Sequence, residues 1–479
     1  MEQIVIVLAE PSFLGSRTPL EIVLILAAAL LGAGVIVLLS FRLPARTLLA
    51  GAFALGTLQF FGPFGFTSLG LIATAALLPG AIWRFWRGNA HVWIGLLGAL
   101  AVWQAISVLW ADKVGSAAYG VLLTLALIAT ALLARETIRS SPQGLIAALA
   151  IVSPLILIEA WLVTLFRLAP DLEKAYLTSP IARVFTEPGV EMIAHGSTEN
   201  VNDIFKAGGL FLNANTASLF LAVVACLYVW AALQRPGRAR FWLFLAVAAI
   251  SLDASLGTGS KTPLVAIVIL PVLGVLALVA VRKPILTVVV AVAGAGLAAG
   301  AVAVVTAMRP RLLDEVVRTL DERRRLWGVV FQRFPENWFT GLGFGNWRLT
   351  IAEEWRMAFP GRGLQLFPPH NLFAQAWADA GIIALLLTIA LSLLPIIAVL
   401  RRIGAARHDK LVSRASVELL VVFVGVSWVL AHGMLDTTTF LGDNHLVPFF
   451  AAITAVAFST RLGTRQDGRI PSASVSQAA

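Results

Sequence analysis

Charged residues are scarce in this chain of 479 residues: they make up 13% of it, 59% is hydrophobic, and the mean hydropathy is +0.87. A soluble domain is usually about half apolar and about a quarter charged. The shortage of charge therefore excludes a soluble globule, a disordered chain and a coiled coil. The 39 Gly and 14 Trp instead fit a polytopic helical membrane protein, in which glycine is tolerated and tryptophan gathers at the interfaces.

Cysteine and metal-binding patterns are also nearly absent. The only cysteine, Cys226, lies inside an apolar run, which excludes both a disulfide framework and a cysteine-based metal site. There is no Asp-x-Asp motif and no His/Asp/Glu cluster with convincing ligand spacing. This pattern argues against a metal-dependent sugar-nucleotide enzyme, and we expect no metal and no cofactor.

Long apolar runs dominate what is present. A spanning helix needs about 20 mostly apolar residues, and 13 runs of about that length occur. The second and third are the least secure, because Phe61-Gly-Pro-Phe-Gly65 between them can be a hairpin turn or a re-entrant tip. The runs are 20–40, 46–61, 67–83, 91–110, 116–134, 143–166, 208–233, 241–257, 262–281, 284–307, 372–400, 414–435 and 445–460. We expect an all-α, polytopic inner-membrane helical bundle of 12 or 13 transmembrane helices. No cleaved signal peptide is predicted, because residues 1–15 lack a basic start and a small-residue cleavage site.

The net charge of +10 is interpreted as a topology signal rather than as a nucleic-acid signal. Nineteen of the 36 basic residues, against three acids, lie in one alternating set of short loops and the C-terminal tail. Short cytoplasmic loops carry such an excess of Lys and Arg, so this set, with the C-terminus, is predicted to be cytoplasmic. With 13 spans the N-terminus is external, and the polar tail 461–479 is expected to be disordered.

Two segments on the opposite, external side are too long to be simple connectors. Segment 169–207 is acidic, whereas segment 308–371 contains ten Arg, seven acids and no Lys. Arginine without lysine favours bidentate recognition of phosphate or carboxylate over simple charge.

The Arg-rich segment contains an amphipathic helix, predicted over 309–334. Its apolar stripe includes Leu313, Val316, Val317, Leu320, Trp327, Val330, Phe331 and Phe334. Arg323 and Arg324 fall on this stripe, where a guanidinium needs an anion, a headgroup or a buried carboxylate. A snorkelling or structurally paired arginine is the alternative. Arg325 points to the polar side, and an exposed pair with Asp321 explains it.

Two further residues stand at the external ends of spans. His370 can accept a proton from a hydroxyl nucleophile near neutral pH, although a helix-capping or interfacial histidine is the alternative. Lys261 can be an interfacial anchor or part of the same site. Ionisable residues in or near spans, among them His432 and Asp436, leave a proton-coupled transporter open, but no internal repeat typical of transporters is found.

Four motifs resemble the bacterial O-antigen ligase and polymerase superfamily of membrane glycan transferases. They are Gly208-Gly-Leu-Phe-Leu-Asn-Ala-Asn215; Thr258-Gly-Ser-Lys-Thr262; Arg323-Arg-Arg-Leu-Trp327 with Pro335 and Gly341-Leu-Gly343; and His370-Asn-Leu-Phe-Ala-Gln375 with Gly381. The resemblance covers about 208–395. Ligases of the family often carry Thr where this chain has Ala384.

The resemblance implies a periplasmic-face glycosyltransferase that uses an undecaprenyl-diphosphate-linked glycan as donor. His370 would be the base that takes the proton from an acceptor sugar hydroxyl, and Arg323 would bind the departing diphosphate in place of a metal. Arg324, Lys261, Asn215 and Asn371 would help to bind substrate. Direct displacement would invert the anomeric centre.

The acceptor decides the reaction's name. Lipid A–core makes the protein an O-antigen ligase, our first expectation, whereas a lipid-linked glycan makes it an O-antigen or exopolysaccharide polymerase. A protein acceptor and a membrane transporter remain further alternatives. We predict N-terminal helices with the acidic loop over 1–207, a ligase-like core over 208–400, and C-terminal helices over 401–460. The expected partners are the bilayer and these glycans, and not nucleic acid.

Overall fold

The computed structural model describes residues 19–61, 68–86, 91–112, 114–186, 205–211, 213–234, 237–308, 311–347, 369–406 and 413–459. Within these ranges every regular element is helical, and nine helices are long and apolar enough to cross a membrane. The all-α polytopic membrane bundle is therefore confirmed. The tail predicted to be disordered lies outside the described residues.

Among the described residues of the N-terminal half there are ten α-helices and one 3₁₀ turn. They are α2 (Pro19–Arg42), α3 (Ala45–Leu58), α4 (Leu69–Ala75), α5 (Leu78–Phe85), α6 (Val92–Ser107), η1 (Val108–Trp110), α7 (Val114–Ser140), α8 (Pro142–Leu168), α9 (Pro170–Leu177), α10 (Ala182–Phe185) and α12 (Ala214–Leu233). The second half contains α13 (Arg238–Gly257), α14 (Lys261–Arg282), α15 (Pro284–Met308), α16 (Arg311–Asn337), α19 (Leu372–Ala405), α20 (Arg414–Gly433) and α21 (Val447–Phe458).

Each of the 13 predicted runs overlaps at least one of these helices, but not every run forms a single long helix. The run 67–83 is divided into α4 and α5, and the helices of the first three runs and α21 include only short apolar stretches. The predicted acidic loop 169–207 contains the short helices α9 and α10.

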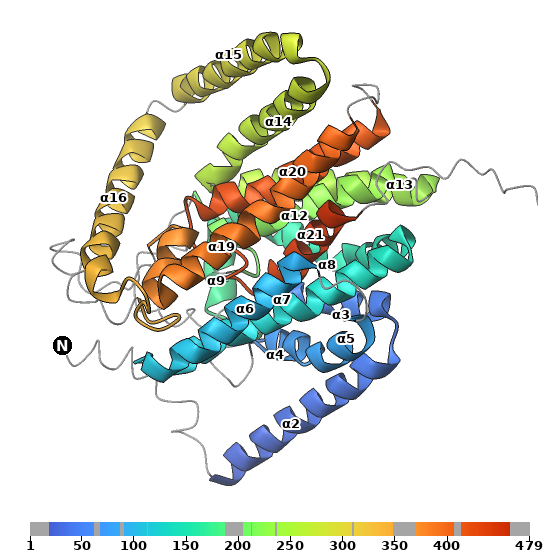
Figure 1. Cartoon of the computed structure of the whole chain (residues 1–479), viewed down its shortest axis with the longest axis vertical. Coiled ribbons are helices and arrows are strands. Elements are labelled where there is room, and N and C mark those ends of the chain that lie inside the picture. Colours follow the sequence, from blue (N-terminus) through green and yellow to red (C-terminus); the bar gives the residue numbers. More distant parts are fainter. Residues whose placement is uncertain are drawn as a thin grey trace, which may run out of the picture.

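Helix α12 forms the centre of the bundle (Figure 1). Nearly all of its side chains are buried, on every face, by α13, α20, α8 and α21. The close approach depends on small residues: a Cβ added to Gly425 of α20 would lie 3.1 Å from Cys226 Cβ of α12. Small residues allow helices in a bilayer to approach closely and gain dispersion contacts.

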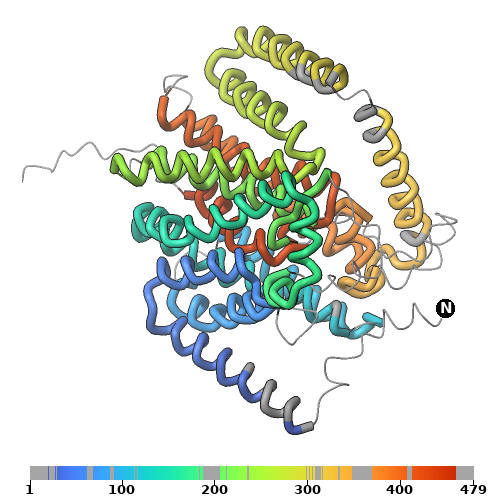
Figure 2. The backbone as a smooth tube through the Cα atoms, turned by 180° about the vertical axis from the view of Figure 1, so that it is seen from behind, coloured from blue at the N-terminus to red at the C-terminus, as the bar shows by residue number. Residues whose placement is uncertain are grey.

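Helices α14, α15 and α16 form an arch that leaves the bundle and returns to α19 (Figures 1 and 2). Among the side chains of α16 that the structure describes, the buried apolar ones are in its C-terminal half, at Leu326, Val329 and Val330. Val317, Leu320 and Phe331 of the predicted apolar stripe are exposed. The predicted helix is present, but helical spacing alone does not say which portion of its apolar stripe meets a partner.

Candidate functional site

Asp436 lies at the centre of a polar cluster just beyond the end of α20. Its side chain is 2% exposed, and its Oδ1 accepts hydrogen bonds from Thr437 N at 2.7 Å and from Thr438 N at 3.2 Å. Its Oδ2 accepts a bond from Asn215 Nδ2 at 2.8 Å. Burial disfavours the charged carboxylate, but the interactions with His370, His432 and Thr438 N outweigh burial and hold the pKa of Asp436 well below its usual range. Asp436 is therefore a buried anion with several partners.

His370 faces this anion from the start of α19. Its Nδ1 lies 3.7 Å from Asp436 Oδ2, close enough for charge attraction but longer than a hydrogen bond. The residue has a φ of +47°, in the left-handed region that is uncommon for residues other than glycine. Such strained backbone clusters at functional sites.

Asn371, and not His370, caps α19. Its Oδ1 accepts hydrogen bonds from Phe373 N at 3.0 Å and Ala374 N at 2.9 Å. Its Nδ2 donates to Met434 O at 3.0 Å, which ties the start of α19 to the end of α20. These contacts position His370 beside Asp436, and they give Asn371 a positioning role in addition to the substrate contact expected of it.

Arg323 brings a positive charge to the cluster from α16. Burial lowers the pKa of Arg323, while the charge of Asp436 acts in the opposite direction. One turn later, Trp327 Nε1 donates to Pro369 O at 2.9 Å and holds α16 against the residues before α19. Arg324 is exposed, so the two adjacent arginines have different surroundings. Arg325 pairs with Asp321 at 3.4 Å, as predicted.

Asn215 enters the site from the first turn of α12, and two buried carboxylates shape the turn before it. Glu173 Oε1 accepts a hydrogen bond from Gly208 N at 2.9 Å, and Glu159 Oε2 accepts one from Leu210 N at 3.0 Å. Gly209, with a φ of +66°, has no room for a side chain, because a Cβ would lie 2.2 Å from Glu159 Oε1. Burial raises the pKa of Glu173.

Lys261 is positioned by other contacts, at the first residue of α14. Ala207 N donates to Thr258 O at 3.0 Å, and a Cβ on Gly259 would lie 1.9 Å from Phe205 O. The turn before Lys261 therefore packs on the chain that leads into α12. This turn and the first turn of α12 lie at the same end of the bundle.

The glycine-rich segment 341–345 is a packed turn rather than a phosphate loop. Leu342 N donates to Ala378 O at 2.8 Å, and Trp347 N donates to Asp379 Oδ1 at 3.1 Å. Helix α19 breaks at this contact, where Gly381 has a φ of +72° and a Cβ would lie 1.8 Å from Phe339 O. Residues 338–347, which follow α16, therefore pack on α19 at residues 378–381.

The structure brings together three of the six predicted site residues. Asn215 and His370 lie beside Asp436, and the charge of Asp436 acts on Arg323. Asn371 fixes the start of α19 next to His370, whereas Arg324 is exposed and Lys261 begins α14. We did not predict Asp436 as a site residue. The available signal was the pair His432 and Asp436, four residues apart at the end of a span that is predicted to be external. Within the described ranges no three His, Cys, Asp or Glu side chains group closely enough to hold a metal ion.

These observations define a multi-pass helical membrane protein with a charged site at one end of its bundle. Residues 246–389 match the family model described as O-Antigen ligase. This match confirms the resemblance to the O-antigen ligase and polymerase superfamily and supports a glycosyltransferase-like function of that general type. Lys261, Arg323 and His370 lie inside the matched region, and Asn215 and Asp436 lie outside it. A search among curated proteins finds no match to the chain.

Proposed function

We propose that the protein is a periplasmic-face glycan transferase that moves a glycan from undecaprenyl diphosphate to a sugar hydroxyl. The observation that carries the proposal is the convergence of His370 and Arg323, from two different helices, on the buried Asp436. A base and a cation that both interact with one buried anion are the two groups that this transfer needs. The expected topology, with basic loops in the cytoplasm, supports a periplasmic position for this end of the bundle.

His370 acts as the base in the proposed reaction. Its Nδ1 faces Asp436, and in the proposed reaction its Nε2 takes the proton from the acceptor hydroxyl. As the hydroxyl oxygen forms its bond to the anomeric carbon, the bond from that carbon to the diphosphate oxygen breaks. Asp436 stabilises the imidazolium that forms, because the opposite charges lie close together in a buried place.

Arg323 stabilises the leaving group. The departing undecaprenyl diphosphate gains negative charge, and a guanidinium can bind two of its oxygens at once. Lys261 and Arg324 assist from the periphery. In this scheme the cations neutralise the leaving group without a metal ion, and a single displacement inverts the anomeric centre. The products are the glycosylated acceptor, undecaprenyl diphosphate and one proton.

Ligation to lipid A–core is the first assignment, and polymerisation of lipid-linked repeat units is the alternative. A transporter is less well supported, because the charged residues assembled by Asp436 lie at one end of the bundle and transporter sites lie near its middle.

The experiment is deletion of the gene in the native organism, followed by electrophoresis of lipopolysaccharide and secreted polysaccharide. Lipopolysaccharide confined to lipid A–core, with long glycan accumulating on the lipid carrier, supports the ligase. Core capped by a single repeat, or loss of an exopolysaccharide alone, supports the polymerase. Unchanged glycans would overturn the proposal.

Complementation with His370→Ala separates chemistry from folding. We expect purified His370→Ala to bind the lipid-linked donor but not to transfer the glycan. Near-normal turnover would remove His370 from the mechanism.

A further inference from the structure

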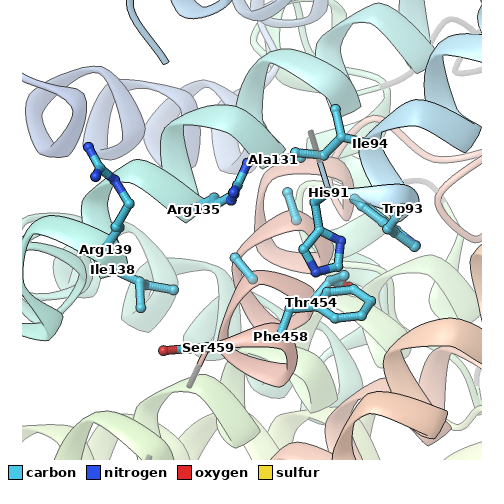
Figure 3. Close-up of a pocket in the computed structure, with 12 residues that line it drawn as sticks. His91, Trp93, Ile94, Ala131, Arg135, Ile138, Arg139, Thr454, Phe458 and Ser459 are labelled. Atoms are coloured by element: carbon cyan, nitrogen blue, oxygen red, sulfur yellow. The ribbon is translucent and has the colours of Figure 1, made fainter. Parts of the chain in front are cut away.

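A second polar site lies at the opposite end of the bundle from Asp436. A cavity of about 420 Å³ opens between α6, α7 and α21. Its lining includes His91, Trp93, Arg135, Arg139, Thr454 and Phe458 (Figure 3).

The ends of these three helices show that the cavity is remote from the candidate active site. Near the start of helix α7, the Tyr119 hydroxyl donates a hydrogen bond to Asn444, which lies in the loop after Asp436. Arg135 and Arg139 lie near the end of the same helix. Sixteen residues separate Tyr119 from Arg135, which at about 1.5 Å per residue is roughly 24 Å. The cavity thus lies at the end of the bundle that the basic residues predict to be cytoplasmic.

Two arginines bring positive charge to the cavity. Arg135 and Arg139 both line it, Glu136 binds Arg139 through Nε at 2.8 Å, and burial together with the charge of Arg135 lowers the pKa of His91 in the same lining. The carbonyl end of α21 does not cancel this charge, because Arg402 donates to Val456 O and Ala457 O at 3.1 Å. The cavity therefore attracts anions.

Two buried polar groups in the lining are available to a ligand. Thr454 is 1% exposed, and neither its Oγ1 nor His91 Nδ1 has a hydrogen-bond partner among the described residues. Buried polar atoms are almost always hydrogen-bonded, so such atoms around a cavity indicate an occupant. Burial, together with the charge of Arg135, lowers the pKa of His91, so the ring is neutral and can donate a hydrogen bond.

The rest of the lining is apolar. The Trp93 ring is held in place by its Nε1, which donates to Leu391 O at 2.9 Å. The Phe458 ring lies with its centroid 4.0 Å from that of His91. Ile94, Ala451 and Ala455 complete this apolar wall. An occupant therefore meets cations and hydrogen-bond donors on one side and hydrocarbon on the other.

We propose that this cavity binds the phosphate group of an anionic phospholipid from the leaflet opposite the candidate active site, with the acyl chains against Trp93 and Phe458. Arg135 and His91 lie on facing sides of the cavity and bracket the phosphate (Figure 3). The same phosphate chemistry could come from a soluble phosphate. The mixed lining favours the lipid, because a soluble ion would leave the apolar wall without a partner.

The test measures thermal unfolding of the delipidated full-length protein in detergent, by tryptophan fluorescence. The additions are phosphatidylglycerol, phosphatidylcholine with the same acyl chains, and inorganic phosphate. We expect phosphatidylglycerol to raise the Tm in a concentration-dependent way and phosphatidylcholine to have little effect. An equal rise with inorganic phosphate would assign the site to a soluble phosphate and overturn the lipid assignment.

Three variants locate the effect. Arg135→Gln should require about tenfold more phosphatidylglycerol for the same rise in Tm, since it removes a charge-assisted hydrogen bond. Thr454→Val keeps the shape of a buried side chain and should weaken the effect by a smaller factor. The control is Arg240→Gln, an exposed arginine at the same end of the bundle but outside the cavity.

An equal rise in Tm for the wild type, Arg135→Gln and Thr454→Val would overturn the site. So would a response that appears only after residues 460–479 are removed, because the chain's own tail would then be the occupant. None of these measurements depends on catalytic activity, so the result is independent of the proposed function.

Discussion

Replacing Asp436 by Asn tests the centre of the candidate active site while keeping its shape. The amide oxygen can still accept the hydrogen bonds from Thr437 N and Thr438 N. The amide nitrogen then faces Asn215 Nδ2, 2.8 Å from the present Oδ2, so that two donors meet. The negative charge opposite His370 is lost at the same time.

The expected loss follows from these contacts. Opposite charges about 4 Å apart attract each other by about 1 kcal/mol in water and by about 4 kcal/mol near a protein surface. If the carboxylate acts mainly when His370 carries a proton, most of this energy is lost in the transition state, and kcat should fall by about 10- to 150-fold. KM for the donor should change much less, because Arg323, and not Asp436, is the proposed diphosphate ligand.

The assay is glycan transfer from a purified undecaprenyl-diphosphate donor in detergent, with kcat and KM measured against pH. Asp443→Asn is the matched control: Asp443 is 1% exposed in the same loop, and its Oδ1 accepts a hydrogen bond from His445 N at 2.9 Å. A kcat for Asp436→Asn within about threefold of the wild type would refute the reasoning. Equal losses in both variants would show that the loop has a structural role only.

Three further predictions concern the supports of the site. Arg323→Lys keeps the charge but loses the bidentate fork, so donor affinity should fall about tenfold, and by less in Arg324→Lys, as measured by binding of labelled donor. Burial raises the pKa of Glu173, so folding favours the protonated carboxyl and stability falls as pH rises above the ordinary glutamate pKa of 4.5. Glu173→Gln should show a flatter dependence of Tm on pH. Gly381→Ala should destabilise the protein by about 2–4 kcal/mol, because its Cβ would lie 1.8 Å from Phe339 O; an unchanged Tm would contradict this packing.

The helices were predictable because their signals are local. An apolar run of spanning length has one stable backbone in hydrocarbon, namely a helix that bonds its own N–H and C=O groups. This reasoning identifies α12 and α19 without any knowledge of their neighbours. It does not identify which run becomes the central helix of the bundle. Helix α12 is buried on every side and α15 is almost wholly exposed, although the two helices have similar hydropathy.

The site was predictable only where a motif carried it. His370 and Arg323 came from a resemblance, and the spacing of α16 placed Arg323 and Arg324 equally on one stripe. The structure separates the two arginines because α16 meets the bundle along only part of its length. Such a difference depends on tertiary packing and leaves no trace in helical periodicity.

Asp436 was missed for a related reason: it lies 66 residues after His370, and no local pattern links the two. The link is made by Asn371, which caps α19 through its oxygen and binds Met434 O through its nitrogen. A cap alone would leave the preceding residue free to extend away from the helix. The second bond joins α19 to the end of α20, and His370 adopts a φ of +47° between the two helices. A left-handed residue costs about 1–3 kcal/mol and persists only where its surroundings hold it. The strained backbone of His370 and the buried charge of Asp436 are therefore two parts of one arrangement, in which each unfavourable feature is stabilised by contacts that bring the other into place.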